Sequence, residues 1–273
     1  MWAAAIAGVV GVVLLFVILS FQDLPTFQEL ENPESNLASP VYASNGEVLG
    51  RYYVENRTAV AYEDLSPHLV EALIATEDER YFDHSGIDAK GLARAIVKTG
   101  IMGNKNAGGA STITQQLSKL LFTGKPGSGF ARLLQKLKEW IISLRLERKY
   151  TKKEIIAMYL NKFPFVNGAY GINSAAEIYF NKSQRDLDVL ESAMLVGMLK
   201  NPSLFNPVKR PDTTAHRRMV VLKQMEKNGI LSTEDYDSLR LQPLDMSNFN
   251  RKTHADGLAP YFRMELRKEL FRI

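Results

Sequence analysis

Cysteine is absent from the 273-residue chain. Its absence excludes a disulfide-stapled fold, thiolate-ligated zinc or iron–sulfur sites, and a cysteine nucleophile. The four histidines are scattered and form no HExxH pair, so a histidine-ligated metal is not expected. Neither a P-loop nor a GxGxxG dinucleotide motif occurs in the sequence. The common thiol-, zinc- and nucleotide-dependent enzyme classes are therefore excluded.

Charge is absent from the first 22 residues, and the run from Trp2 to Phe21 is apolar except for Ser20. Twenty helical residues span about 30 Å, the thickness of a bilayer's hydrocarbon core. A cleaved signal peptide would have a basic start, a shorter apolar core and a small-residue cleavage site, and these features are missing here. We therefore predict a retained transmembrane helix within residues 1–22. No lysine or arginine precedes the span, so its orientation stays open.

The full sequence is 23% charged and 45% hydrophobic, which is typical of a folded domain. Residues 23–62 are interpreted as a stalk and short β linker, with an Asn45-Gly46 turn between β-rich runs that predicts a small hairpin. Residues 63–242 are predicted to form one mainly α domain. Its predicted helices are 67–80, 88–100, 112–122, 129–148, 151–161, 169–180, 187–200, 212–228 and 232–240. Residues 243–273 are less regular.

Helix boundaries follow from local signals. Ser66-Pro67 places an N-cap and a proline at the start of the first helix. Asp188 with Glu191 forms a capping box that begins another, and Asn201-Pro202 ends it.

Glu77 continues the apolar stripe of the helix predicted for 67–80, because it follows Leu69 and Leu73 at i+4 spacing. A partly desolvated carboxylate has a raised pKa and suits general-base chemistry. The alternative is a glutamate at a frayed helix end, and for a lone glutamate that alternative is favoured. Asp78 and His84 lie close by in the sequence, and their presence favours a catalytic role for Glu77 only modestly.

A second segment, GGASTITQQLSKLLF (108–122), places two glycines and two hydroxyls, Ser111 and Thr112, at a helix start. The spacing of Thr112 and Gln115 also fits a simple capping box, which explains the capping by itself. Glycines, hydroxyls and a helix N-terminus can also bind phosphate oxygens, with Lys119 as a countercharge.

The third segment is the helix predicted for 129–148, on which Glu139 lies opposite the apolar face, near Arg132, Gln135 and Lys136. It is either one half of a surface ion pair with Lys136 or a cleft-facing carboxylate among cations. From Lys119 to Lys153 the sequence has ten lysines and arginines and two glutamates, a net charge of +8. This density indicates a polyanionic partner. Beside a membrane anchor, and without an RNA- or DNA-binding signature, anionic lipid or lipid-linked phosphate is favoured over nucleic acid.

Together these segments resemble the peptidoglycan glycosyltransferases of family 51, which form the glycosyltransferase domain of class A penicillin-binding proteins and also occur alone. The resemblance runs from about residue 40 to 228. Five motifs match in order: Glu77-Asp78…Tyr81…His84…Gly86, Gly109 to Gln116, Gln135-Lys136-Leu137-Lys138-Glu139, Tyr159-Leu160-Asn161, and Arg217-Arg218-Met219-Val220-Val221-Leu222. Tyr81 replaces the family's phenylalanine, and Gln135 replaces a pyrophosphate-contacting arginine. Arg132, one turn earlier, could substitute for that arginine.

The resemblance implies a mainly α, lysozyme-like fold with a membrane-associated small lobe, a short β-hairpin segment and one N-terminal transmembrane helix. It implies polymerisation of lipid II by a single-pass protein of the cytoplasmic membrane whose catalytic domain is extracytoplasmic. Glu77 resembles the general base, and Glu139 the second carboxylate. The substrate-binding residues implied are Asp78, His84, Ser111, Thr112, Gln115, Gln116, Lys119, Arg132, Lys136, Tyr159, Asn161, Arg217 and Arg218.

No tightly bound cofactor is implied, although a divalent cation (Mg²⁺ or Mn²⁺) could act at Glu139. The expected partners are lipid II, the nascent glycan chain, membrane lipid and other cell-wall synthesis proteins. Residues 243–273 are expected to begin a linker toward a transpeptidase domain. Two alternatives remain: a lysozyme-like lytic hydrolase of peptidoglycan, and a non-enzymatic membrane scaffold whose motifs are relics.

Overall fold

The computed structural model describes residues 39–46, 48–52, 59–97, 111–122, 129–250, 261–262 and 265–266. Over these residues the protein is mainly helical, as the sequence predicts. No helix among them is long and apolar enough to cross a bilayer. The transmembrane helix predicted within residues 1–22 lies outside the described residues.

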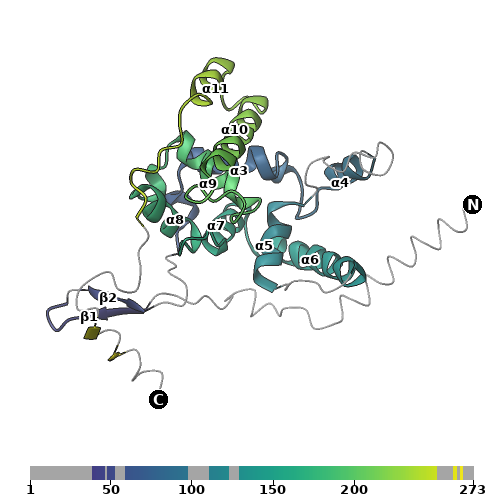
Figure 1. Ribbon diagram of the computed structural model, residues 1–273. Helices are drawn as coiled ribbons and strands as arrows, with labels where there is room; N and C mark the ends of the chain where they lie inside the picture. Colours follow the sequence, from purple (N-terminus) through teal and green to yellow (C-terminus); the bar gives the residue numbers. More distant parts are fainter. Residues whose placement is uncertain are drawn as a thin grey trace, which may run out of the picture. The chain divides into compact units, whose positions relative to one another are not determined.

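Two strands pair antiparallel in a two-stranded sheet, β1 (Ser39–Tyr42) and β2 (Val48–Tyr52) (Figure 1). The turn after β1 is closed by the Gly46 N–H, which donates to the Ala43 carbonyl at 2.9 Å. Gly46 has a φ of +86°, a conformation that glycine adopts without steric cost, and this accounts for a glycine at that position of the turn.

The described chain divides into two compact units. Unit 1 comprises the described residues from 80 to 159, and unit 2 comprises those before residue 80 and after residue 159. The boundary at residue 159 falls inside helix α7 (Lys152–Lys162).

Unit 1 contains α4 (Ala89–Ile96), α5 (Ile113–Phe122), α6 (Gly129–Lys149) and most of α7. Helices α5 and α6 lie side by side (Figure 1). One polar contact between them is a hydrogen bond of 2.9 Å between the buried Ser118 and Ser143 hydroxyls. The larger buried apolar side chains of the unit are Tyr81, Ile113, Leu117, Leu137, Ile141, Ile142, Leu146, Ile155, Ile156 and Tyr159. Each fully buried leucine or isoleucine stabilises the fold by about 1.5–3 kcal/mol.

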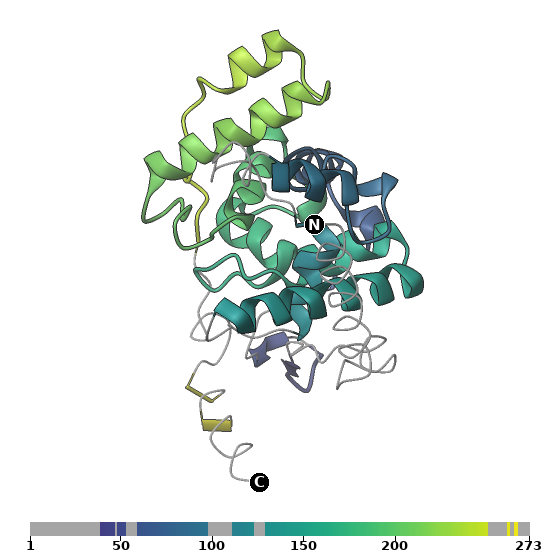
Figure 2. The ribbon, with the colours of Figure 1, turned by 90° about the vertical axis from the view of Figure 1, so that its right-hand side faces the viewer.

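Unit 2 contains α3 (Pro67–Glu77), α8 (Gly171–Phe180), α9 (Val189–Leu199), α10 (Pro211–Lys227) and α11 (Thr233–Leu239). Helix α9 is its core, because every residue from Ser192 to Leu199 is buried. Helices α3 and α10 both pack against α9 and also against each other (Figures 1 and 2).

Each predicted helix has a counterpart, and the caps explain most of the boundaries. The capping box of Asp188 and Glu191 is confirmed, with both reciprocal hydrogen bonds present. Pro67 begins α3 as predicted, but the Ser66 hydroxyl donates to the Leu187 carbonyl at 2.7 Å and does not cap the helix. Helix α3 ends at Glu77 and not near residue 80, because Asp78 leaves helical geometry with φ −158° and ψ 73°.

Candidate functional site

A buried carboxylate lies on α6 in unit 1. Glu139 is 5% exposed, and its two carboxylate oxygens accept hydrogen bonds from different side chains. Gln135 Nε2 donates to Oε1 at 3.1 Å, and Lys136 Nζ lies 3.1 Å from Oε2. Lys136 Nζ also donates to the Ser111 hydroxyl at 2.8 Å. The ion pair that the sequence suggested between Lys136 and Glu139 is therefore present. The carboxylate itself is buried, so the interpretation as a solvated surface face is wrong for Glu139.

The start of α5 is fixed by buried hydrogen bonds to Gly86. Thr112 Oγ1 donates to the Gly86 carbonyl at 2.7 Å and accepts from the Gln115 N–H at 3.2 Å. The Gln115 side chain, 1% exposed, donates to the same carbonyl at 3.3 Å and does not reach back to Thr112. Thr112 thus caps α5, but only half of a capping box forms.

Gly86 requires glycine for two reasons. Its φ of +84° is disfavoured for other residues, and a Cβ there would lie 3.0 Å from the Ser143 carbonyl oxygen. The first and second sequence motifs therefore meet at this residue in unit 1.

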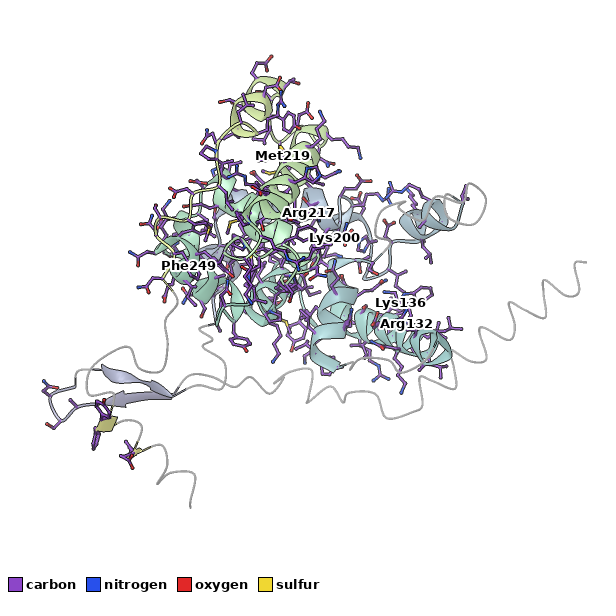
Figure 3. The ribbon with its side chains drawn as sticks, viewed as in Figure 1. Arg132, Lys136, Lys200, Arg217, Met219 and Phe249 are labelled. Atoms are coloured by element: carbon purple, nitrogen blue, oxygen red, sulfur yellow. The ribbon has the colours of Figure 1, made fainter. Side chains whose placement is uncertain are left out.

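Three cations of unit 1 differ in exposure. Lys136 is half-buried, whereas Arg132 and Lys119 are exposed on α6 and α5. Figure 3 labels Arg132 and Lys136 on α6, one turn apart. Gln135, at the position where the resemblance leads one to expect an arginine, donates an uncharged N–H to Glu139.

In unit 2 the predicted base ends α3. The Glu77 side chain is 15% exposed, and its Oε1 lies 3.6 Å from a guanidinium nitrogen of Arg217 on α10. Burial lowers the pKa of Arg217, and the charge of Glu77 raises it. Asp78 follows as a buried residue whose N–H donates to the Ile74 carbonyl at 3.1 Å. The expected base is thus held next to a buried cation.

Three other predicted site residues make structural contacts. Tyr159 is fully buried and donates its hydroxyl to Gln116 Oε1 at 2.8 Å, which ties α7 to α5 within unit 1. In unit 2, Asn161 bonds both backbone groups of Val60, at 3.1 Å to its N–H and 2.8 Å to its carbonyl. In unit 1, the ring of His84 lies edge-on to Tyr81, with centroids 6.2 Å apart. These contacts position backbone segments of the motifs.

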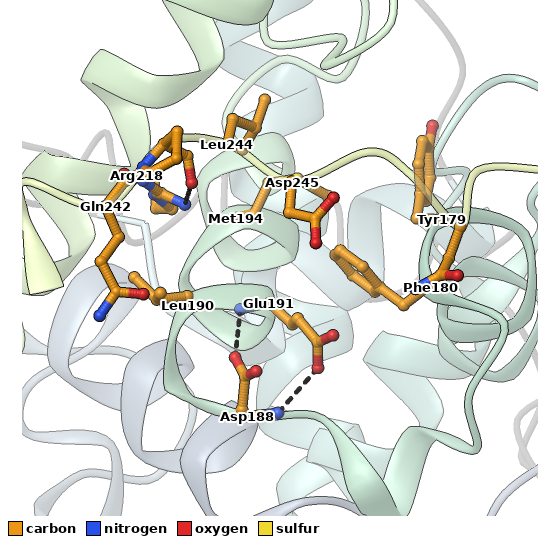
Figure 4. Close-up of a pocket in the computed structure, with 12 residues that line it drawn as sticks. Tyr179, Phe180, Asp188, Leu190, Glu191, Met194, Arg218, Gln242, Leu244 and Asp245 are labelled. Carbon is orange, nitrogen blue, oxygen red and sulfur yellow. Dashed lines mark hydrogen bonds between the residues drawn. The ribbon is translucent and has the colours of Figure 1, made fainter.

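Arg218 lies at a separate pocket of unit 2 with a volume of about 310 Å³ (Figure 4). Its guanidinium donates to the carbonyls of Gln242 and Pro243. The pocket's acidic side chains are Asp188, Glu191 and Asp245, and none of the other predicted site residues lines it. Arg218 therefore holds the segment that follows α11 against α10.

One buried network in unit 1 was not foreseen from the sequence. Glu147 Oε1 accepts from Thr114 Oγ1 at 2.6 Å and from Lys152 Nζ at 2.8 Å, so that α5, α6 and α7 meet at one carboxylate. Lys152 Nζ also lies 4.3 Å from the centroid of the Tyr81 ring. Glu147 and Lys152 are only five positions apart, but Thr114 lies 33 positions before Glu147. A fold is needed to bring Thr114 to this carboxylate, so no local signal could have identified the whole network.

The donor set at Glu139 does not fit a resident divalent cation. Mg²⁺ and Mn²⁺ prefer several oxygen ligands, whereas Glu139 supplies one carboxylate with an ammonium 3.1 Å away. Among the described residues, no cluster of three or more histidine, aspartate or glutamate side chains could hold a metal. We therefore derive no step through a metal ion.

Comparisons with known proteins identify sequences that are related to this chain. Residues 45–226 match the model of a protein family described as transglycosylase. Penicillin-binding protein 1A of Neisseria flavescens is 33% identical over 262 residues, covering 96% of this chain and 32% of that protein. Penicillin-binding protein 1A of Escherichia coli (strain K12) is 34% identical over 251 residues, with coverages of 91% and 28%. Penicillin-binding protein 1F of Bacillus subtilis (strain 168) is 40% identical over 198 residues, with coverages of 72% and 27%.

The chain spans about a third or less of the length of these relatives. A crystal structure of penicillin-binding protein 1A from Haemophilus influenzae aligns with a TM-score of 0.48 at 23% identity, covering 88% of this chain and 24% of that one.

Proposed function

Because this chain belongs to the transglycosylase family, we propose that it is a peptidoglycan glycosyltransferase that polymerises lipid II into β-1,4-linked glycan strands. The observation that carries the proposal is a chain of contacts next to the start of α5. The Ser111 hydroxyl, just before that helix, accepts from Lys136 of α6, which also pairs with the buried Glu139. Hydroxyl, ammonium and helix N-terminus together suit a pyrophosphate. We also propose that the chain has the lysozyme-like fold of this family, with a membrane-associated lobe.

The proposed reaction needs one base and a cationic cradle. Glu77 accepts the proton of the acceptor's GlcNAc 4-hydroxyl as that oxygen bonds to the anomeric carbon of the growing chain. The bond from that carbon to the polyprenyl pyrophosphate breaks, and the attack from the opposite face gives inversion. Pyrophosphate leaves readily once its charge is neutralised, so no general acid is required.

The roles in unit 1 follow from this division. Lys136 and Ser111 contact pyrophosphate oxygens, and the exposed Lys119 and Arg132 add countercharge. Glu139 orients Lys136 and assists at the donor sugar. Thr112 and Gln115 hold the start of α5 rigid through Gly86. Rigid donors stabilise developing charge without reorganisation, which is the main source of such catalysis.

The location proposed is the outer face of the cytoplasmic membrane, with residues 1–22 as a single-pass anchor. Residues 23–62 act as the stalk and linker, 63–242 as the catalytic domain and 243–273 as the start of a further linker. Lipid II, the nascent glycan, membrane lipid and other cell-wall synthesis proteins are the proposed partners. The proposed substrate is lipid-linked, so an enzyme held at the membrane meets it there.

The test is polymerisation of purified lipid II in detergent. Glu77→Gln is expected to abolish chain growth, because the amide cannot accept the proton. Loss of the charge beside Arg217 should also lower the melting temperature, so circular dichroism at the assay temperature is needed to show that the variant remains folded. Glu71→Gln is the matched control, since Glu71 lies exposed on the same helix and pairs only loosely with His68. Full activity of Glu77→Gln would overturn the assignment. Release of muropeptides from isolated sacculi by the parent protein would favour the hydrolase alternative.

A further inference from the structure

Arg217 is enclosed by three different elements of unit 2. Its guanidinium nitrogen lies 3.6 Å from Glu77 at the end of α3, and its Nε donates to the Gly197 carbonyl of α9 at 3.4 Å. The ring of Phe205, in the loop after α9, lies 5.7 Å from the guanidinium carbon. The side chain is 11% exposed. Figure 3 labels Arg217 on α10.

Helix α9 is shaped to admit this side chain. Gly197 lies in a fully buried stretch of α9, and a Cβ there would lie 3.1 Å from Arg217 Cγ. Glycine in a helix interior costs about 1 kcal/mol relative to alanine. The close approach of Arg217 is a physical reason for this residue at this position.

The charge that balances Arg217 comes from Glu77. Three contacts of Arg217 are described above, and of these the Gly197 carbonyl and the Phe205 ring are uncharged, whereas the Glu77 carboxylate is charged. Burial lowers the pKa of Arg217, and the Glu77 charge opposes that shift. Attraction between a buried cation and a carboxylate this close to it restricts the positions of both side chains.

We infer that Arg217 is a positioning residue for Glu77: it holds the carboxylate of the proposed base in place at the end of α3. This differs from the substrate contact that the sequence resemblance implies. The separation of 3.6 Å is longer than a hydrogen bond, so the contact between the two side chains is an ion pair without a hydrogen bond. The inference rests on the proposed function for its catalytic meaning, but the pairing can be measured without turnover.

The first experiment compares Arg217→Gln and Arg217→Lys in lipid II polymerisation across pH, in the full chain. In Arg217→Gln the acid limb of the kcat profile is expected to move to higher pH, since the neighbouring positive charge is lost. We expect kcat to fall about tenfold or more, with KM for lipid II unchanged. Arg217→Lys keeps the charge, so its acid limb is expected to stay near that of the parent.

A second variant moves Arg217 without replacing it. Gly197→Ala adds a methyl group that displaces the arginine stem, and the acid limb is expected to shift in the same direction by a smaller amount. Gly129→Ala is the matched control, because a Cβ there meets nothing within 4 Å. Arg185→Gln is the control for loss of an arginine, since Arg185 pairs with Asp64 on the exposed surface of the same unit.

A readout without substrate separates this inference from the proposed function. In protein labelled with ¹³C at glutamate carboxyls, the Glu77 signal is identified by its loss in Glu77→Gln. Its titration curve is expected to move to higher pH in Arg217→Gln. If it moves but the parent polymerises no lipid II, the proposed function fails and the pairing stands. An unmoved curve, or a raised KM with an unmoved acid limb, overturns the inference and makes Arg217 a substrate contact.

Discussion

At the scale of single residues, Glu139 accepts one hydrogen bond from a charged donor and one from a neutral donor. Lys136 supplies an ammonium, whereas Gln135 supplies an amide at the position where the resemblance leads one to expect an arginine. If an arginine there would neutralise the pyrophosphate, another cation must do so in this chain. Arg132, exposed one turn earlier on α6, is one candidate.

Removal of Arg132 should reveal whether it supplies that charge. Arg132→Ala is expected to weaken binding of the donor substrate, or of a phosphoglycolipid inhibitor such as moenomycin, by about tenfold. Arg148→Ala, at an exposed position of the same helix, is the control and should change affinity little. The double variant Arg132→Ala/Gln135→Arg should regain affinity. Unchanged binding in Arg132→Ala would mean that another cation neutralises the pyrophosphate.

Thr112 offers a test of rigidity at the start of α5. Thr112→Ala removes the cap on the Gln115 N–H and one donor to Gly86, so the free energy of unfolding should fall by about 1–2 kcal/mol. Thermal unfolding measures the loss, and Thr112→Ser should restore most of it because the hydroxyl is kept. A melting temperature equal to the parent's in Thr112→Ala would show that the bonds at Gly86 contribute little.

At the scale of elements, the N-cap of α4 predicts a pH dependence. Asp88 accepts from the Gly91 N–H at 2.9 Å and is paired with Arg80. Burial raises the pKa of Asp88, but these two partners outweigh it and hold the pKa below its usual value of 3.8. A lowered folded-state pKa gives stability that is present above the unfolded pKa and is lost as pH falls through the folded one.

The measurement is the melting temperature of the parent and of Asp88→Asn. The parent should be more stable near neutral pH, by about 0.5–1 kcal/mol, and the difference should shrink as the pH falls below about 4. Asp83→Asn, in the exposed turn before α4, is the control with no cap to lose. A difference that does not change with pH would rule out the carboxylate's charge as its cause.

The elements were largely predictable because their signals are local. The capping box of Asp188 and Glu191 lies within four residues. The other helices bury one face, and the spacing of apolar residues on that face predicted them. The loop after α7 was not predictable, since Val166 and Asn167 adopt φ values of 58° and 51° that local sequence disfavours. Tertiary hydrogen bonds to Tyr179 and Asn206 hold Asn167 there.

The candidate site was predictable only through resemblance to a family. Residue periodicity placed Glu77 on the apolar stripe but could not show that Arg217, 140 positions later, lies beside it. In the same way, the spacing of Ser111 and Lys136 gives no reason to expect their contact. Such pairs depend on how helices pack, which is fixed by burial of the whole core.

At the scale of the whole molecule, charge is concentrated in one part of the sequence. The full chain carries +4, while the segment from 119 to 153 alone carries +8. If that segment attracts an anionic lipid-linked substrate, KM for lipid II should rise several-fold between about 0.05 and 0.5 M salt, because screening shortens the Debye length. Polymerisation kinetics at a fixed detergent concentration measure this. A KM independent of salt would argue against electrostatic capture.

The division into two units has a mechanical consequence. Within the described residues, the chain leaves unit 2 between Glu79 and Arg80 and returns between Tyr159 and Leu160. The return lies inside α7, where a change of backbone angles would break helical hydrogen bonds, so it is stiff. The other crossing, from Glu79 to Arg80, lies outside any α-helix, because α3 ends at Glu77. The carboxylate proposed as the base therefore belongs to the last helical residue before the chain passes from unit 2 to unit 1.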